Sequence, residues 1–326
     1  MNCLPIFEPI RNDLAAVEAR MLAAVGETYE PLSSALAGLL KSGGKRLRPA
    51  LVILSARLFR WDPEPVTNLA AAVEMLHTAT LIHDDTIDGA TVRRGQRTLN
   101  ATWSRSATIL AGDYLFARAA ALAADTSSTR VASIFAHTLM TICQGELRQM
   151  LSLFDWRGSR DDYYERIYAK TASLFAAACE GGAVLAGAPE AGVDTLRDYG
   201  RSLGMAFQIV DDILDFTGDE GRLGKPVGSD LRQGIATLPV YHYLHSGGDV
   251  LLVETALDRD VAGRDGRDRA VADLVAAIAS SGAIDECRRE ASELVQRAAG
   301  SLAGLGDGPY QRTLRDLAAF VVSRDA

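Results

Sequence analysis

The chain has 326 residues, which is enough for one large domain or two small ones. Its 34 Lys and Arg residues against 42 Asp and Glu residues leave a formal net charge of −8, and this balance argues against a nucleic-acid-binding surface. A hydrophobic content of 48% is sufficient for a sizeable core.

The cysteines and the N-terminal segment favour a protein of the reducing cytoplasm. The four cysteines are widely scattered, and no pair has the spacing of a zinc site or a redox motif. The N-terminal segment contains acidic side chains early and no long apolar stretch, so we expect no signal peptide. No uninterrupted apolar run reaches about 18 residues, so we expect no transmembrane helix.

Helical periodicity dominates the chain, because Ala and Leu recur at helical spacing and alternating β-branched runs are scarce. The predicted helices are, in chain order, Asp13–Val25, Val66–Thr86, Ser106–Ala124, Arg130–Phe154, Asp161–Ala186, Asp194–Phe216, Arg269–Ala279 and Ile284–Ala303. Turn-rich clusters separate the helices, and none has the character of an interdomain linker. We therefore predict a single all-α domain over residues 1–326, built from about ten or more helices.

The predicted helix Val66–Thr86 runs into the stretch LIHDDTIDGATVRRG, which contains three closely spaced aspartates. Asp84 and Asp88 are four positions apart and share a helical face, with Asp85 beside them. Carboxylates crowded at the end of an apolar helix repel one another and are costly to desolvate, so they need a cation.

The same DDxxD pattern recurs within FQIVDDILDFTGD, where Asp211 and Asp215 share a helical face and Asp212 is adjacent. A solvated acidic face would explain a single cluster of this kind as well as a metal site does. Two clusters on apolar helices instead favour Mg²⁺, which is typically held by one or two carboxylates together with substrate phosphates. Facing each other in a helical bundle, the clusters would form one cage that promotes ionisation of a diphosphate ester.

Several basic and polar residues are candidates to bind the parts of a diphosphate substrate that metal ions do not contact. The segment GGKRLRP combines glycines that let a phosphate approach with the charges of Lys45, Arg46 and Arg48, although a solvated loop explains it equally well. The other candidates are His77, Arg93, Arg94, Lys170, Thr171 and Gln208. A lone histidine in a helix is more often an ordinary core residue, whereas a lysine within an apolar helix requires an anionic partner.

Together these segments resemble the trans-type isoprenyl diphosphate synthases of the medium- and long-chain type, which are all-α prenyltransferases that elongate allylic diphosphates. The similarity runs from about Gly43 to Pro239 and, more loosely, to FVVSRDA near the C-terminus. It rests on the order and spacing of GGKRLRP, HTATLIHDDTID followed by RRG, AGDYLFARA, KTA, FQIVDDILD and GKPVGSDL. The resemblance implies a bundle around a central cavity, of the class I isoprenoid synthase type, and a cytoplasmic homodimer.

The resemblance also implies a role for each matching residue. About three Mg²⁺ ions would be bound with the allylic diphosphate by Asp84, Asp85, Asp88, Asp211, Asp212 and Asp215, with Asp211 the strongest ligand of the second cluster. The allylic diphosphate would be gripped by Arg93, Lys170 and Lys225. A metal-free pocket for isopentenyl diphosphate would be formed by Lys45, Arg48, His77 and Arg94. Thr171 and Gln208 match positions that stabilise the allylic cation through oxygen dipoles.

The implied reaction is a head-to-tail (1′-4) condensation. Loss of diphosphate gives an allylic cation, the double bond of isopentenyl diphosphate attacks it, and a proton is then lost to the departed diphosphate. One position departs from the family, because many members carry a lysine before TLP and this chain has Ile235 there. We therefore expect one diphosphate contact to be missing.

Product length is expected to depend on residues that precede the first acidic cluster in the same helix. Ala79 and Thr80 precede Asp84 by five and four residues and would form the first floor of a product tunnel. Both are small where short-chain members tend to carry aromatics, so we predict a product longer than C20, about C30–C50. Phe135, on the same helical face as Glu146, is either a deeper floor or an ordinary core residue.

Other classes of protein share part of this chemistry. A class I terpene synthase or cyclase also ionises diphosphates with Mg²⁺, but such proteins usually replace the second aspartate-rich motif and line their pockets with aromatics. This chain keeps both motifs and has only 6% aromatic residues, which disfavours a cyclase. A geranylgeranyl or farnesyl diphosphate synthase, or a catalytic subunit that needs a different partner, stays open.

Overall fold

The computed structural model describes residues 4–42, 44–93, 95–218, 226–258 and 263–324. Regular structure in these ranges is almost entirely helical, which confirms the predicted all-α class with more than ten helices. By their internal contacts the residues form two compact units. The first unit comprises Met1–Leu139, Leu174–Gly200 and Ser301–Leu317, and the second comprises Met140–Ser173, Arg201–Gly300 and Ala318–Ala326. The single-domain organisation stays a prediction.

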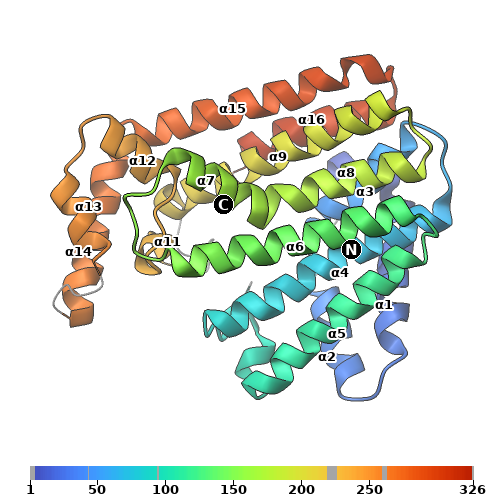
Figure 1. Ribbon diagram of the computed structural model, residues 1–326, viewed down its shortest axis with the longest axis horizontal. Helices are drawn as coiled ribbons and strands as arrows, with labels where there is room; N and C mark the ends of the chain where they lie inside the picture. The colour runs from blue at the N-terminus through green and yellow to red at the C-terminus, as the bar shows by residue number, and fades with distance from the viewer. Residues whose placement is uncertain (1–3, 43, 94, 219–225, 259–262, 325–326) are drawn as a thin grey trace. The chain divides into compact units, whose positions relative to one another are not determined.

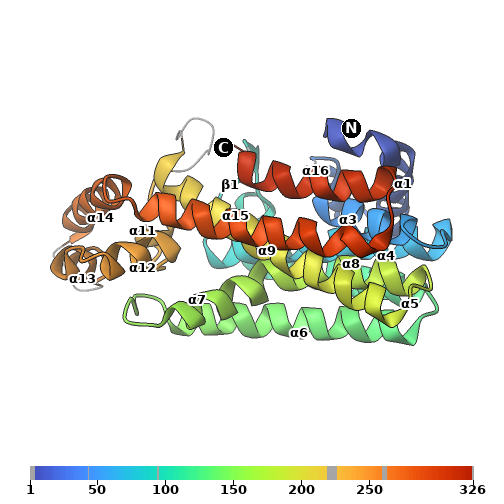
Figure 2. The same ribbon diagram turned by 90° about the horizontal axis from the view of Figure 1, so that it is seen from above.

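The first unit is built around a long buried helix. Its elements are η1 (Pro5–Ile10), α1 (Arg11–Gly26), α2 (Leu32–Lys41), α3 (Leu47–Arg57), α4 (Pro63–Ile87), β1 (Val92–Arg93), β2 (Gln96–Arg97), η2 (Leu99–Ala101), α5 (Arg105–Ala124), the first part of α6 (Thr129–Leu151), most of α8 (Ser173–Leu185), the first part of α9 (Glu190–Thr217), η4 (Leu302–Leu305) and the first part of α16 (Pro309–Ser323). Helix α4 packs against α1, α3 and α5 (Figures 1 and 2). Ala70, Ala71 and Ala72 are fully buried, and their small side chains allow neighbouring helices to approach α4 closely.

Helix α4 has clear start and stop signals. Pro63 occupies its first turn, where a missing backbone N–H costs nothing. The helix ends at Ile87. Its C-cap residue Asp88 donates its N–H to the Asp84 carbonyl, and Gly89 follows with a φ of 66° that suits glycine. The first acidic cluster therefore lies at the C-terminal end of α4, and a short antiparallel hairpin pairing Arg93 with Gln96 comes next.

The second unit contains the rest of the described helices. Its elements are the remainder of α6, α9 and α16, together with α7 (Arg160–Ile167), η3 (Tyr168–Ala172), α11 (Ser229–Arg232), α12 (Leu238–His245), α13 (Val250–Ala256), α14 (Gly263–Ala279) and α15 (Ala283–Ser301). Helices α13 and α14 lie side by side in both views (Figures 1 and 2). Helix α7 begins with a capping box, in which Ser159 and Asp162 each accept a hydrogen bond from the backbone N–H of the other.

Three helix predictions need correction, and one of them is α14, which begins at Gly263 rather than Arg269. The predicted helix Asp161–Ala186 is interrupted, because α7 passes through the π-helical turn η3 before α8 begins. A π-turn carries an extra residue per turn, and such turns are frequent at functional sites. Helix α6 ends at Leu151 rather than Phe154, which adopts a φ of 71° and donates its N–H to the Gly234 carbonyl.

Helix α5 is, within the described ranges, the one helix long and apolar enough to cross a membrane by length and composition. This is weak evidence for a membrane span, since core helices of soluble proteins meet the same criterion. Helix α5 also carries Asp113 and Arg118 and packs along α4.

Candidate active site

The first acidic cluster lies in the first unit, at the C-terminal end of α4. Asp85 is buried, Asp84 is half-buried and Asp88 is exposed. Burial raises the pKa of Asp85, and the hydrogen bond and charge of Arg93 partly offset that increase. Because the C-terminus of a helix is the negative end of its dipole, carboxylates crowded there are stabilised by cations.

Arg93 supplies one such cation. Its Nε donates to Asp85 Oδ1 over 2.7 Å, and its position is set by the hairpin of β1 and β2. The sequence placed Arg93 near the first cluster, and the structure brings the two side chains into contact. Arg94 lies outside the described residues, so its predicted role stays a prediction.

His83 was not singled out by the sequence, yet it fixes the last turn of α4. Its Nε2 lies 3.1 Å from the Ile109 carbonyl and 3.3 Å from Asp113 Oδ1, both on α5. A Cβ added to Gly112 would lie only 2.3 Å from this nitrogen. A side chain at that position of the AGDYLF segment would displace the imidazole from its contacts with α5.

Three of the predicted residues precede the first cluster in α4. His77 is half-buried, and its carbonyl accepts the Thr80 hydroxyl at 2.8 Å. Ala79 is fully buried. Phe135, in α6, is also buried. The proposed roles of Ala79, Thr80 and Phe135 in product length stay predictions.

The basic segment GGKRLRP separates into residues with different surroundings. Lys45 is exposed, and Arg48 is half-buried with its guanidinium 4.9 Å from the centre of the Phe175 ring. Arg46, expected to supply charge to a phosphate, instead has a side chain only 8% exposed and bonds Glu74 at 3.0 Å and Glu18 at 3.2 Å. Its guanidinium is therefore committed to the protein interior.

The second acidic cluster lies in the second unit, near the C-terminal end of α9, and its members have different environments. The Asp211 side chain is 41% exposed and pairs with Arg324 at 2.8 Å. Asp212 is only 3% exposed and Asp215 only 1%. Asp215 Oδ2 accepts the backbone N–H of Asp230 at 3.0 Å, which ties α9 to the start of α11.

Arg324 is a second arginine paired with an acidic cluster, and it was not predicted as a site residue. Besides Asp211, it bonds the Phe207 carbonyl at 2.6 Å, and its guanidinium lies 3.8 Å from the centre of the Phe207 ring. The signal that could have found it is the FVVSRDA segment, in which a basic residue follows the apolar run at its start.

Asp212 is the centre of a buried hydrogen-bond chain. Tyr163 Oη donates to Asp212 Oδ2 at 2.7 Å, and Gln208 Nε2 donates to Asp212 Oδ1 at 2.9 Å. Thr171 Oγ1 in turn donates to Gln208 Oε1 at 2.6 Å. Burial and then the charge of Asp230 raise the pKa of Asp212, while the bonds from Gln208 and Tyr163 lower it. The predicted pair Thr171 and Gln208 is thus in direct contact.

The π-turn η3 carries two of the predicted residues, Lys170 and Thr171. Lys170 is half-buried, and its Nζ lies 3.0 Å from Glu146 Oε1 on α6. The prediction that this lysine would have an anionic partner is confirmed. Close packing at this point depends on Gly145, where an added Cβ would lie 2.5 Å from Ala169 Cβ.

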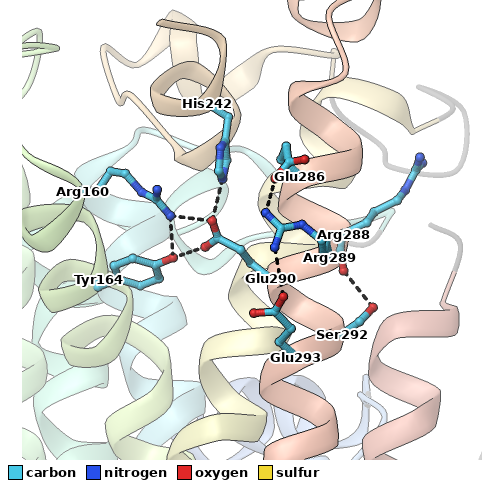
Figure 3. A network of polar contacts seen from close by, with 9 residues as sticks. All are labelled: Arg160, Tyr164, His242, Glu286, Arg288, Arg289, Glu290, Ser292 and Glu293. Carbon is cyan, nitrogen blue, oxygen red and sulfur yellow. Dashed lines mark hydrogen bonds and ion pairs between the residues drawn. The ribbon is translucent and has the colours of Figure 1, made fainter. Parts of the chain in front are cut away.

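Another polar network joins residues of α7 to α12 and α15 (Figure 3). Glu290 on α15 accepts hydrogen bonds from Arg160 at 2.5 Å and from Tyr164, and it lies 2.8 Å from His242 Nε2. Burial alone would raise the pKa of Glu290, but His242, Tyr164 and Arg160 together lower it to about 2. The network therefore joins α7, α12 and α15 around one ionised carboxylate.

Two further predictions concern the segment after α9. Lys225 lies outside the described residues, so its contact with the allylic diphosphate stays a prediction. Ile235, at the place of the family lysine, is half-buried and donates its N–H to the Asp230 carbonyl at 2.9 Å.

Comparisons with known proteins place this geometry in context. The polyprenyl synthetase family model matches residues 29–274. The chain is 40% identical over 326 residues to heptaprenyl diphosphate synthase component 2 of Geobacillus stearothermophilus, covering 100% of both chains. It resembles the crystal structure of heptaprenyl diphosphate synthase from Staphylococcus aureus with a TM-score of 0.91 and 35% identity, covering 97% of this chain and 99% of that one. It also resembles the polyprenyl synthase of Caulobacter crescentus CB15, complexed with calcium and isoprenyl diphosphate, with a TM-score of 0.90 and 39% identity over 98% of this chain and 97% of that one.

Proposed function

Because the chain belongs to the polyprenyl synthetase family, we propose that it is a prenyltransferase that condenses isopentenyl diphosphate head-to-tail with an allylic diphosphate. The product is longer than C20, about C30–C50, in keeping with the heptaprenyl synthases among its relatives. The observation that carries the proposal is that two helices, α4 and α9, each bear a DDxxD cluster with an arginine paired to one carboxylate. Each acidic cluster thus already pairs with a positively charged side chain, and such clusters suit a diphosphate bound with metal ions.

The carboxylates suit Mg²⁺ as a partner. Among the described residues, no group of three acidic, His or Cys side chains gathers tightly enough to hold a metal ion by itself. Mg²⁺ in phosphate-transfer sites uses one or two carboxylates together with waters and substrate oxygens, so a protein-only cage is not required. The accessible members, Asp84, Asp88 and Asp211, are the first candidates for direct ligands, and about three ions would be bound with the allylic diphosphate.

When bound, Mg²⁺ would neutralise the diphosphate as it leaves the allylic carbon. Arg93, Lys170 and Lys225 are proposed to add positive charge to this leaving group. Lys45, Arg48, His77 and Arg94 would hold isopentenyl diphosphate without metal. Thr171 and Gln208 would turn oxygen atoms toward the developing allylic cation, which stabilises it electrostatically.

Product analysis tests this function. The purified protein is incubated with Mg²⁺, labelled isopentenyl diphosphate and, in separate reactions, C10, C15 and C20 allylic diphosphates, and the dephosphorylated products are sized by chromatography. We expect a ladder that ends at one length and disappears in Asp84→Ala. Asp285→Ala, an exposed carboxylate on α15, is the matched control and keeps the ladder. No elongation with any primer would contradict a self-sufficient synthase.

The alternatives give different products in the same assay. A cyclase would convert the allylic primer alone into a hydrocarbon or alcohol. A geranylgeranyl or farnesyl diphosphate synthase would stop at C20 or C15. A catalytic subunit that needs a second component would leave all primers unchanged until that component is added. This alternative is included because the Geobacillus relative is named component 2 of its synthase.

Assembly and location follow the family expectation. We propose a cytoplasmic homodimer with no nucleic-acid partner. Light scattering of the purified chain measures its mass, and a monomer that elongates the primer at full rate would contradict the dimer.

A further inference from the structure

Four side chains of the second unit form a continuous, mostly buried chain of hydrogen bonds. The order is Tyr163, Asp212, Gln208 and Thr171, with donor–acceptor distances of 2.7, 2.9 and 2.6 Å. Tyr163 is fully buried, Asp212 is 3% exposed and Thr171 is 6% exposed. Gln208 is half-buried, so water competes least for the fully buried bond between Tyr163 and Asp212.

The chemistry of the groups sets the direction of each bond. Tyr163 Oη and Gln208 Nε2 both donate to the Asp212 carboxyl group, which turns the NH₂ group of Gln208 toward Asp212. The carbonyl end of Gln208 then points the other way and accepts the Thr171 hydroxyl proton. The direction of the whole chain is therefore decided by the carboxylate of Asp212.

This direction matters for the proposed reaction. With its proton committed to Gln208, the Thr171 oxygen can offer only lone pairs to a neighbouring group. A reversed Gln208 would instead turn NH₂ protons toward Thr171, and the Thr171 hydroxyl could then turn its own proton outward. A cation is stabilised by oxygen lone pairs and destabilised by an outward-pointing proton, so the orientation set by Asp212 favours an allylic cation.

Asp212 is also poorly placed to bind a metal ion. Each of its two oxygens already accepts a hydrogen bond from a neighbouring side chain. By contrast, the Asp211 side chain is 41% exposed. The two adjacent aspartates of one motif thus have different surroundings, which suits different roles.

We propose that Tyr163 and Asp212 are positioning residues, which fix the oxygen dipoles of Gln208 and Thr171, and that Asp212 is not a direct metal ligand. The inference rests on the proposed function, since it assumes an allylic cation beside Thr171. Tyr163 acts through Asp212 and Gln208 and touches neither substrate nor metal.

The first test uses two tyrosines that are adjacent in α7. Tyr163→Phe removes the hydroxyl bonded to Asp212, and Tyr164→Phe removes the hydroxyl bonded to Glu290 (Figure 3). We expect Tyr163→Phe to lower kcat by about 10- to 100-fold, with KM for both diphosphates within about threefold of wild type. We expect Tyr164→Phe to keep kcat within about threefold, although it loses thermal stability. Equal kcat values for the two variants, or a change confined to KM, would overturn the proposal.

The second test does not depend on turnover. Binding of Mg²⁺ in the presence of inorganic diphosphate is measured by calorimetry for Asp211→Asn and Asp212→Asn. We expect Asp211→Asn to weaken binding at least about tenfold and Asp212→Asn to change it by less than about threefold. Equal weakening in both variants would show that Asp212 is a ligand and would overturn the proposal. Thermal unfolding of each variant checks that both are folded at the assay temperature.

Failure of this inference is distinguishable from failure of the proposed function. A wild-type chain that elongates no primer contradicts the function. A wild-type chain that elongates normally, with Tyr163→Phe equally active, contradicts only the positioning role.

Discussion

Arg46 offers a direct test of how the basic segment GGKRLRP is divided between folding and substrate binding. Its guanidinium donates to Glu74 Oε1 at 3.0 Å, to Glu18 Oε1 at 3.2 Å and to the Leu40 carbonyl at 2.5 Å. The side chains of Arg46 and Glu74 are only 8% and 7% exposed. Replacing Arg46 with Met therefore leaves the Glu74 carboxylate buried without its main counterion.

The expected cost is large for a single substitution. Removing one partner of a buried ion pair typically costs about 3–5 kcal/mol, because the remaining charge stays desolvated. Met keeps a similar length and adopts the same backbone conformation, at a φ of 50°, with a strain similar to that of Arg. For a chain of this size we expect roughly 2 °C of Tm per kcal/mol, so the variant should unfold about 6–10 °C below wild type.

Thermal unfolding followed by circular dichroism measures the effect, and Lys45→Met is the matched control. Lys45 is exposed, so its loss should change stability by no more than about 0.5 kcal/mol. Lys45→Met should nevertheless raise KM for isopentenyl diphosphate about tenfold, if Lys45 contacts that substrate. In the double variant Arg46→Met/Glu74→Leu, both charges are replaced by apolar groups, and most of the lost stability should return.

Equal Tm values for Arg46→Met and Lys45→Met would refute this reasoning. So would an Arg46→Met variant that is as stable as wild type but has a strongly raised KM, since Arg46 would then act on substrate rather than on Glu74.

Three further predictions concern pH, metal binding and product length. The pKa of Glu290 is lowered to about 2, so its stabilising effect is present above its ordinary value of 4.5 and is lost as the pH falls from there toward 2. Glu290→Gln should therefore be about 1.5–3 kcal/mol less stable than wild type at pH 7. The free energies of unfolding of the two proteins, measured with urea, should become equal as the pH falls from 4.5 toward 2. A difference in free energy that stays constant down to pH 2 would contradict this. Arg324→Gln removes the cation paired with Asp211, so Mn²⁺ alone, titrated by electron paramagnetic resonance, should bind about fivefold tighter, and unchanged affinity would show that the arginine does not compete. Ala79→Tyr should shorten the product by several isoprene units in the ladder assay, and an unchanged length would exclude Ala79 as a tunnel floor.

The helices and the acidic clusters were accessible to sequence reasoning because both depend on local spacing. Helical periodicity located α4 and α9 to within a few residues, and the i, i+4 spacing of the aspartates follows from the geometry of one helix. The boundary errors have local causes that a periodic pattern does not record. Phe154 leaves the helix in a left-handed conformation, and η3 adds a π-turn inside an otherwise continuous helical segment.

The division of labour among similar residues was not accessible in this way. Lys45 and Arg46 are neighbours in one basic segment, and only packing shows that Arg46 is committed to Glu74, 28 positions away. Asp211 and Asp212 are likewise adjacent, but Asp212 is bonded to Tyr163, 49 positions away. Arg93 could be placed near Asp85 because only eight positions separate them, whereas nothing local connects Arg324 with Asp211.

The sequence alone therefore determined the all-α class, the two aspartate-rich motifs and the resemblance to prenyl diphosphate synthases. These properties depend on periodicity and spacing along single helices, which the order of residues sets directly. The tertiary structure decided which carboxylate is buried, which cation neutralises it and which hydroxyl orients it. Those properties depend on contacts between helices distant in sequence, where burial makes each polar group require a specific partner.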